Sequence, residues 1–259
     1  MEKAGGKVPE KVTLGYIHPG DVSEVFMNSV LRLERYELAE NQRMLGTLSK
    51  RAGSGWIASA RNYITEEFLK TDAEWLFMVD ADMGFGPDTL TRLIDAANPT
   101  ARPVVGALAF GHRRVGDDPV LQSYTFECFP TLYEWDDDEA GFRTIDDYPP
   151  DELVPVAATG AACFVVHRDV LAKIRANYGD CWFDRITTAK GTRLGEDLSF
   201  FIRVAGVAAP TFVHTGIHTA HDKGGIFLRQ EEYREQRRPR VAGDRTASAT
   251  VAREGKETR

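Results

Sequence analysis

The chain has 259 residues, of which 42% are hydrophobic and 10% aromatic, and its formal net charge is -7 with an isoelectric point near 5.5. This length and apolar content predict one large α/β domain with a sizeable core rather than two small domains. A protein that holds nucleic acid through its phosphates needs a basic face, so the negative charge argues against nucleic acid as a partner.

The cysteines and the apolar runs indicate the compartment. Cys128, Cys163 and Cys181 are odd in number and form no CxxC pair, which argues against a disulfide framework or a zinc knuckle and suits a reducing cytoplasm. The N-terminal segment is too polar for a signal peptide, and the longest mostly apolar run, Val154 to Val166, is short for a membrane span. We therefore expect a cytoplasmic protein without a membrane-spanning helix.

The first part of the chain alternates strand and helix patterns. A short buried strand is predicted within Lys11 to Gly20, and a helix follows over 23–39, with apolar residues at helical spacing at Phe26, Val30, Leu33 and Leu38. Next come a helix over Trp56 to Lys70, a strand over 74–79 and a helix opened by Pro87. Such alternation predicts a Rossmann-like, mainly parallel sheet flanked by helices.

The second part predicts a smaller antiparallel region and a return to the sheet. Arg102 to Phe110 reads as a strand, 111–150 as loops and antiparallel ribbons, and 154–174 as a strand followed by a helix. A short helix over 195–207 is expected to turn Leu198, Phe201, Ile202 and Ala205 to one face. Residues 1–233 form the predicted domain, and the polar residues 234–259 form a tail that we expect to be disordered.

Two aspartates at the end of an apolar strand are the main candidate site. Asp80 and Asp82 follow the run WLFMV, and ligands of open parallel sheets bind at the carboxyl ends of strands. In extended chain these two side chains point the same way, about 6 to 7 Å apart, and their oxygens suit Mg²⁺ or Mn²⁺. Alternatively the two acids cap the next helix or lie in solvent. A calcium loop of the EF-hand type fails, because Gly84 and Thr91 stand at ligand positions.

In their order and spacing, four stretches resemble the GT-A fold of nucleotide-sugar glycosyltransferases, including small enzymes encoded by bacteriophages. They are VTLGYIHPGDV, the segment from ARNYITEEFLK through VDADMGFGPD to TRLIDA, ATGAACFVVHRDVLAKI, and GEDLSFFIRVAGV with the later VHTGIHTAH. Together they span most of residues 11–222. The resemblance implies a metal-dependent transfer of a sugar from a nucleoside-diphosphate sugar, with a UDP-sugar as first choice. It also implies an acceptor that is a virion protein or a glycan, in a host cytoplasm.

The resemblance assigns metal and catalytic roles residue by residue. Asp80 and Asp82 would bind Mn²⁺ or Mg²⁺ and the donor's ribose or diphosphate. A histidine near the end of the domain would complete the metal shell, and His221 fits best by its spacing after the GED motif; His218 and His214 are the alternatives. Asp197 would be the general base, with Glu196 as the alternative. Without the family, the segment HTGIHTAH reads as a surface loop, and acids in a first helical turn favour the helix dipole in any protein.

The donor side of the site is assigned in the same way. Ile17, His18 and Pro19 lie where relatives hold the nucleobase and ribose. Arg61 would pair with the diphosphate, because a planar guanidinium fits phosphate oxygens. Alternatively Arg61 is a solvated helical residue that pairs with Glu66 or another nearby acid.

Two other function classes remain open on the sequence. The segment GSGWIA from Gly53 matches G-x-G-x-x-A, and Glu74 follows about twenty residues later, which imitates the fingerprint of an NAD-dependent oxidoreductase. The preceding GTLSKRA is too polar and basic for the strand that this motif requires. The third class is a sugar- or nucleotide-binding module without turnover, for which the acidic run EWDDDEAGF is a possible cation site or, more simply, a hairpin turn.

Overall fold

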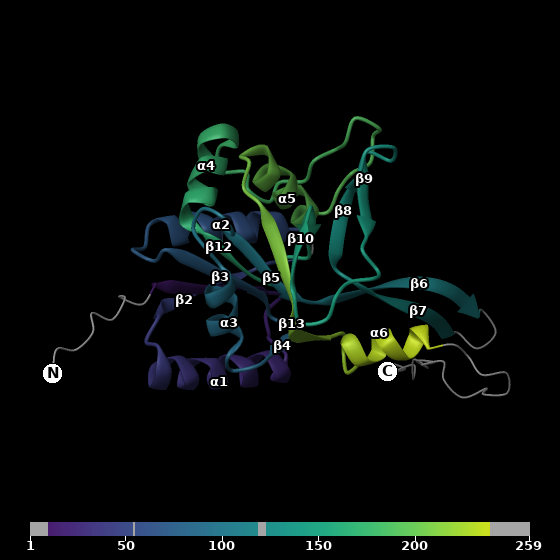
Figure 1. Ribbon diagram of the computed structural model, residues 1–259, viewed down its shortest axis with the longest axis horizontal. Helices are drawn as coiled ribbons and strands as arrows, with labels where there is room; N and C mark the ends of the chain where they lie inside the picture. The colour runs from purple at the N-terminus through teal and green to yellow at the C-terminus, as the bar shows by residue number, and fades with distance from the viewer. Residues whose placement is uncertain (1–9, 54, 119–122, 239–259) are drawn as a thin grey trace, which may run out of the picture.

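A computed structural model describes residues 10–53, 55–118 and 123–238 of the chain. Its centre is a twisted sheet between two layers of helices, with antiparallel ribbons at one end (Figure 1). The strands of this sheet, in order across it, are β10 (Leu153–Val156), β13 (Thr211–Asp222), β5 (Val104–Leu108), β12 (Cys163–His167), β3 (Trp75–Asp80), β1 (Val12–His18) and β2 (Met44–Arg51).

The sheet is mainly parallel, as the sequence predicts. β1 pairs in parallel with β2 and β3, and β13 pairs in parallel with β5. β12 runs antiparallel between β3 and β5, and β10 runs antiparallel at the edge beside β13. The carboxyl ends of β1, β2, β3, β5 and β13 therefore meet at one edge of the sheet, where ligands of such folds bind.

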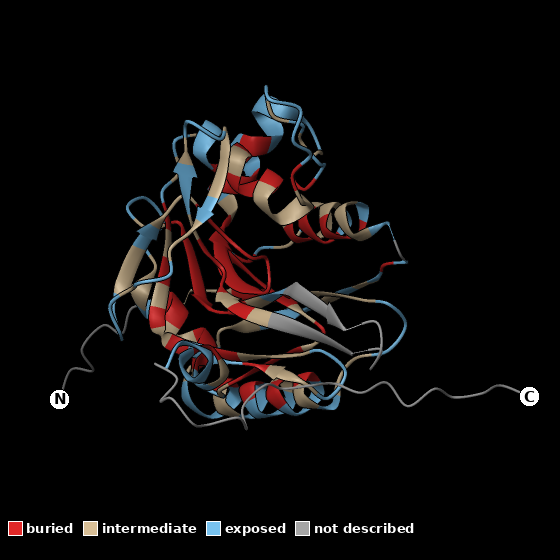
Figure 2. Cartoon of the chain, turned by 90° about the vertical axis from the view of Figure 1, so that its right-hand side faces the viewer, coloured by how far each residue is buried: buried red, intermediate tan, exposed pale blue. Residues whose placement is uncertain are grey.

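Alternation along the central strand divides the core into two layers. Trp75, Phe77 and Val79 of β3 pack against α1 (Glu24–Glu40) and α3 (Thr89–Ala96), while Leu76 and Met78 pack on the other face. That second layer holds α2 (Ile57–Leu69), α4 (Arg168–Tyr178) and α5 (Glu196–Gly206). Figure 2 shows the result as buried strands between helices whose outer faces are exposed. Burial on both faces explains why β3 reads as a continuous apolar run.

Smaller antiparallel elements complete the fold, and the predicted ribbons within 111–150 are confirmed. Two further short strands, β4 and β14, pair with the last residues of β13. The bounds of these elements are β4 (Met83–Phe85), β6 (Phe110–Asp118), β7 (Ser123–Pro130), β8 (Leu132–Asp136), β9 (Gly141–Thr144), β11 (Ala158–Thr159), β14 (Phe227–Leu228) and α6 (Gln230–Arg237).

Two predicted helix faces are wrong at one position each. On α1 Leu38 is 74% exposed, whereas its neighbour Glu37 is 1% exposed. Glu37 is buried because Thr91 of α3 donates a hydrogen bond of 2.9 Å to its Oε1. On α5 Ala205 is exposed and Val204 takes its place in the core. A polar residue with a hydrogen-bond partner can hold an interior position that the apolar pattern assigns to its neighbour.

The structure also describes two segments near the end of the domain. The segment HTGIHTAH is part of the twelve-residue strand β13 and not a surface loop. The helix α6 extends through residue 237, across the predicted domain limit at 233, and its Tyr233 packs against Phe110 with ring centroids 5.5 Å apart. Residues 239–259 lie outside the described residues, so the disorder of the tail stays a prediction. Within the described ranges, no helix is both long and apolar enough to cross a membrane.

Candidate functional site

The strand β3 carries the aspartate pair to the carboxyl edge of the sheet. Asp80 is its last residue, lies opposite Ile17 of β1 in the pairing register and donates its backbone N–H to the carbonyl of Ala162. The chain then turns through Asp82 into β4. Asp80 lies at the end of the strand as predicted, but the expectation that the two side chains point the same way from extended chain is wrong. Residues 81 and 82 form a turn, so Asp80 contacts Arg61 of α2 and Asp82 contacts His221 of β13.

Asp80 belongs to a buried network around Arg61. The Arg61 side chain donates from Nη2 to Asp80 Oδ1 at 2.6 Å and from Nη1 to Glu196 Oε1 at 2.8 Å, and this residue is only 4% exposed. Burial lowers the pKa of Arg61, but the negative charges of Asp80 and Glu196 raise this pKa by more than burial lowers it. The guanidinium therefore stays protonated. Arg61 is therefore not a solvated residue paired with Glu66. A direct contact of Arg61 with a diphosphate stays a prediction.

The pKa values of the two acids at the start of α5 are shifted in opposite directions. Glu196 is held by Arg61 and, at 3.3 Å, by Arg185, and although burial raises its pKa, the two guanidinium groups lower it more. Burial is the main cause of the raised pKa of Asp197, whose Oδ1 accepts only the backbone N–H of Leu198 among the described residues. Glu196 is thus a fixed anion, whereas Asp197 is closer to taking up a proton.

A glycine allows this arrangement at the helix start. A Cβ at Gly195 would lie 2.8 Å from Asp197 Oδ1, so any larger residue would displace the carboxylate. Gly195 precedes the first turn of α5, and its lack of a side chain leaves room for the Asp197 carboxylate, which accepts the backbone N–H of Leu198.

Asp82 meets a histidine and a lysine from β13 and the turn after it. Antiparallel pairing places His221 opposite Met83, which brings His221 Nε2 within 3.2 Å of Asp82 Oδ2. Lys223 Nζ lies 2.9 Å from the same oxygen. Burial raises the pKa of Asp82, but the hydrogen bonds and charges of His221 and Lys223 outweigh it and lower the pKa to about 2.

The other ring nitrogen of His221 is held by the backbone. Nδ1 lies 3.0 Å from the carbonyl oxygen of Phe110, which can only accept, so this nitrogen carries a proton. In the neutral tautomer Nε2 then presents a lone pair to the Asp82 carboxylate. With a proton on Nε2 the contact of 3.2 Å is a hydrogen bond to Asp82, and without one the two atoms are facing acceptors of the kind that ligate one metal ion.

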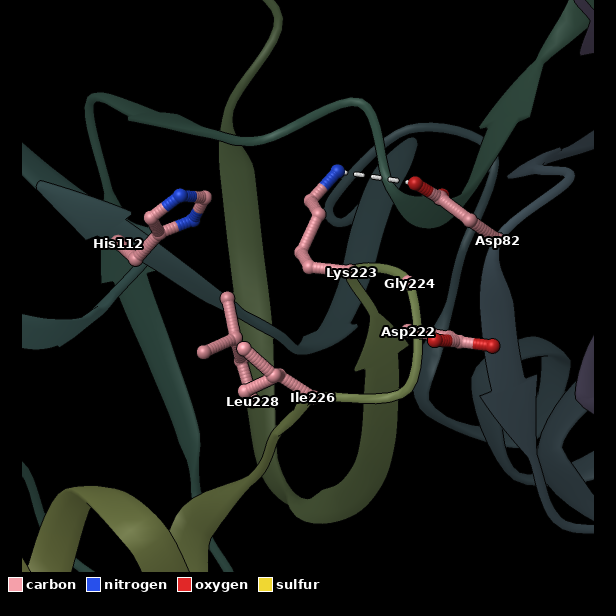
Figure 3. Close-up of a pocket in the computed structure, with 7 residues that line it drawn as sticks. All are labelled: Asp82, His112, Asp222, Lys223, Gly224, Ile226 and Leu228. Carbon is pink, nitrogen blue, oxygen red and sulfur yellow. Dashed lines mark hydrogen bonds and ion pairs between the residues drawn. The ribbon is translucent and has the colours of Figure 1, made fainter. Parts of the chain in front are cut away.

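A cavity of about 410 Å³ opens beside this cluster (Figure 3). Lys223 extends across it toward Asp82, His112 faces it from β6, and Ile226 and Leu228 close its apolar side. Burial first, and then the charges of Lys223 and His221, lower the pKa of His112. The polar part of the cavity lining therefore includes two carboxylates, Asp82 and Asp222, and two basic side chains, His112 and Lys223.

The alternative histidines lie elsewhere on β13. His214 Nδ1 accepts a hydrogen bond from the Gly216 backbone, and His218 lines a second cavity with Arg92 and Arg234. Of the three candidates, the structure brings His221 to the aspartate pair. Within the described part of the chain, no three His, Cys, Asp or Glu side chains are already grouped as metal ligands, so the metal shell of Asp80, Asp82 and His221 stays a prediction.

The end of β1 lies at the same edge of the sheet. Ile17 is the pairing neighbour of Asp80, and the carbonyl of Pro19 accepts a hydrogen bond from Arg51. His18 Nδ1 is buried and has no hydrogen-bond partner among the described residues. A buried polar atom without a partner is uncommon. The nucleotide-binding roles of Ile17, His18 and Pro19 stay predictions.

The geometry counts against a dinucleotide-binding site at Gly53. The expectation that no strand precedes this segment is nevertheless wrong. A strand, β2, does precede Gly53, and the sequence hides it because an exposed edge strand carries polar residues. The acid of the fingerprint should lie near the glycine loop. Glu74, however, lies before β3, at the amino end of the sheet, where it accepts the backbone N–H of Lys11.

Comparisons with known proteins support the fold. No protein-family model matches the chain, and no curated protein matches it. A197 from STIV superposes with a TM-score of 0.48 and 16% identity, over 85% of this chain and 91% of that one. GalNAc-T7, solved with UDP, GalNAc and Mn²⁺, superposes with a TM-score of 0.52 and 9% identity. That match covers 83% of this chain and 44% of GalNAc-T7, and it shows a GT-A-like glycosyltransferase fold.

Proposed function

We propose that the protein is a metal-dependent glycosyltransferase that moves a sugar from a nucleoside-diphosphate sugar to an acceptor hydroxyl. The observation that carries this proposal is the contact between Asp82 and His221, an oxygen and a nitrogen 3.2 Å apart that could bind the same metal ion. It lies at the carboxyl edge of a GT-A-like sheet. GalNAc-T7, which shares this fold, was solved with UDP and Mn²⁺, and we extend that pairing of nucleotide and metal to this chain.

The donor atoms at this edge fit Mn²⁺ or Mg²⁺. Asp82 is ionised near neutral pH because its pKa is about 2, and His221 has its tautomer fixed for ligation through Nε2. Asp80 supplies a second carboxylate of the same motif. A bound ion would act as a Lewis acid that neutralises the charge on the departing diphosphate. Lys223 has to leave Asp82 when such an ion binds, and its ammonium group is then available to a diphosphate oxygen.

The nucleotide would occupy the end of β1. His18 Nδ1 offers one hydrogen bond to the base or ribose, beside Ile17 and Pro19. Arg61 acts in this proposal by holding Asp80 and Glu196 in place, because both prongs of its guanidinium are engaged by carboxylates. It is a positioning residue for the two sides of the site.

Asp197 is the proposed general base. It accepts the proton of the acceptor hydroxyl while the acceptor oxygen forms a bond to the anomeric carbon and the bond from that carbon to the diphosphate breaks. Its raised pKa suits this role better than the lowered pKa of Glu196, because a base works best when its pKa approaches the working pH. Glu196 remains paired with two arginines throughout.

A second candidate function is a nucleotide-sugar-binding module without turnover. The ion pair between Lys223 and Asp82 favours it, since this ammonium group already supplies a positive charge at the place proposed for the metal. The two functions differ in their response to metal removal.

Hydrolysis of UDP-sugars tests the proposal, measured with Mn²⁺ and again with EDTA. We expect turnover that EDTA abolishes and that Asp82→Ala reduces by about 100-fold or more, because a lost metal ligand removes several kcal/mol of stabilisation from the transition state. Asp72→Ala is the matched control, since Asp72 is exposed in a bend at the opposite edge of the sheet. Equal rates for the two variants, or binding of the nucleotide sugar without turnover, would contradict the enzyme assignment.

A further inference from the structure

The hairpin of β8 and β9 lies beside the proposed base. These strands form a sheet with β11, which packs against α5. Tyr133 of β8 packs on the same core layer as Leu198, the residue after Asp197. Ala158 of β11 is the pairing neighbour of Tyr133, so β11 joins this end of the hairpin to α5. The inner end of the hairpin therefore packs beside α5, which carries Asp197 in its first turn.

One face of the hairpin continues outward as a row of aromatic rings. Trp135 lies two residues after Tyr133, on the same side of β8, and is in register with Phe142 of β9. The rings of Trp135 and Phe142 meet edge to face with centroids 5.2 Å apart, and those of Tyr133 and Phe142 at 6.2 Å. We call Tyr133, Trp135 and Phe142 the aromatic platform.

Exposure increases along the aromatic platform. Tyr133 and Phe142 are partly buried against the core, whereas Trp135 lies outside that core layer and is 39% exposed. An indole at this position adds little to the interior of the protein. Because it continues a surface that starts beside the helix of the proposed base, it is placed to contact a bound acceptor.

The polar groups around the platform define the chemistry of a partner. Residues 134–143 carry five carboxylates and one guanidinium, which disfavours anionic partners. Trp135 Nε1 donates to Asp137 Oδ1 at 2.9 Å, and Arg143 is paired with Glu134. The remaining carboxylate oxygens can accept hydrogen bonds from the hydroxyls of a neutral partner. A pyranose combines such hydroxyls with an apolar C–H face that stacks on an aromatic ring.

We propose that the aromatic platform is the acceptor subsite and that the acceptor is a neutral glycan. This inference rests on the proposed function, because it takes Asp197 as the base. Two residues along a strand span about 6.6 Å, so a sugar stacked on Trp135 leaves the next unit of the same glycan beside Tyr133 and Asp197. The acceptor is therefore at least a disaccharide, which binds through its inner unit and is glycosylated on its outer unit.

The test uses binding to the full chain without any donor. The probes are neutral di- and trisaccharides of hexoses, compared with a serine-containing peptide rich in lysine and arginine. The proteins are the wild-type chain and the variants Trp135→Ala and Trp56→Ala. Trp56→Ala is the matched control, because the Trp56 indole at the start of α2 is even more exposed. We expect at least one oligosaccharide to bind, and its Kd to rise about tenfold in Trp135→Ala but not in Trp56→Ala.

Three results would overturn the inference. They are an absence of oligosaccharide binding, an equal loss in Trp56→Ala, and binding of the basic peptide alone, which would indicate a protein acceptor. Hydrolysis of UDP-sugars by the unchanged chain is measured separately. Oligosaccharide binding without hydrolysis would refute the proposed enzyme and keep the glycan subsite, whereas hydrolysis without oligosaccharide binding would refute the subsite and keep the enzyme.

Discussion

The two aspartates at the end of β3 are paired with cations of different kinds. Asp80 contacts the guanidinium of a buried arginine, which in turn contacts Glu196. Asp82, with its side chain 36% exposed, contacts an imidazole and an ammonium group at the margin of a cavity. A buried guanidinium is always charged and cannot leave without exposing uncompensated carboxylates, whereas an ammonium group on a half-exposed carboxylate exchanges readily. The first arrangement fixes geometry, and the second leaves room for a metal ion.

The largest expected difference between the two arrangements is in stability. Arg61→Met removes the charge that compensates Asp80 and Glu196, and breaking a buried pair in this way costs about 3 to 5 kcal/mol. For a domain of this size the loss corresponds to a fall in Tm of about 6 to 20 °C. Arg92→Met is the control, because Arg92 is a more exposed arginine with a 3.5 Å ion pair. Thermal unfolding measures both, and similar Tm values for the two variants would contradict the fixed role of Arg61.

A smaller effect is expected on the pH dependence of stability, to which Asp82 and Asp197 contribute in opposite directions. The folded pKa of Asp82 is lowered to about 2, so its ionised form stabilises the fold above about pH 4, and this contribution is lost as the pH falls toward 2. The folded pKa of Asp197 is raised, so its contribution is full below about pH 4 and is lost as the pH rises through the folded value. Partial solvent exposure reduces the effect at Asp82 to about 1 kcal/mol.

The corresponding variants should therefore shift stability in opposite directions. At pH 7 Asp82→Asn is expected to unfold at lower urea concentration than the unchanged chain, and Asp197→Asn at higher urea concentration. Both differences should shrink on going to pH 3. Urea titrations at pH 3 and pH 7 measure them, with Asp72→Asn as a variant of an exposed acid. Shifts of the same sign at pH 7 would show that the two acids do not differ as described.

The smallest expected effect on stability is at Lys223. Lys223→Met should change the free energy of unfolding by less than about 1 kcal/mol, as is usual for exposed ion pairs. Its informative readout is metal binding, because removing an ammonium group near Asp82 removes about 1 kcal/mol of repulsion toward a divalent ion. The Kd for Mn²⁺, measured by calorimetric titration, should fall about fivefold. Lys70→Met, which loses only surface pairs with Glu66 and Glu67, should leave it unchanged. A weaker Mn²⁺ affinity in Lys223→Met would contradict an exchange between the two cations.

The sequence predicts those parts of the fold that depend on local pattern. Burial on both faces makes β3 a continuous apolar run, and this run by itself is enough to locate Asp80 at the edge of the sheet. The strand β2 is missed for the opposite reason, because an edge strand exposes much of its surface and its residues are polar. The helix face at Glu37 is missed because its hydrogen-bond partner Thr91 lies far along the chain.

The candidate site shows the same limit. The resemblance, with the spacing after the GED motif, favours His221 over His218 and His214, and the structure brings His221 to Asp82. This spacing is not enough to find Lys223 or the partners of Arg61, since the pairs Arg61–Glu196 and Asp82–Lys223 join residues more than 130 positions apart. No local signal marks such pairs. The pairing of β4 with β13, and the placement of α2 and α5 in the same core layer, create them.

The strand β13 passes from the sheet to the site as one element of twelve residues, with one irregularity in its pairing with β5 between His214 and His218. Its first residues pair with β5 and β10, and its last pair with β4 and β14. Amide protons of His221 and Asp222 should therefore exchange with solvent at rates closer to those of the sheet than to those of the turn at Gly224 and Gly225. A chain that keeps its core folded thus also keeps His221 opposite Met83, and local opening is confined to the turn that carries Lys223.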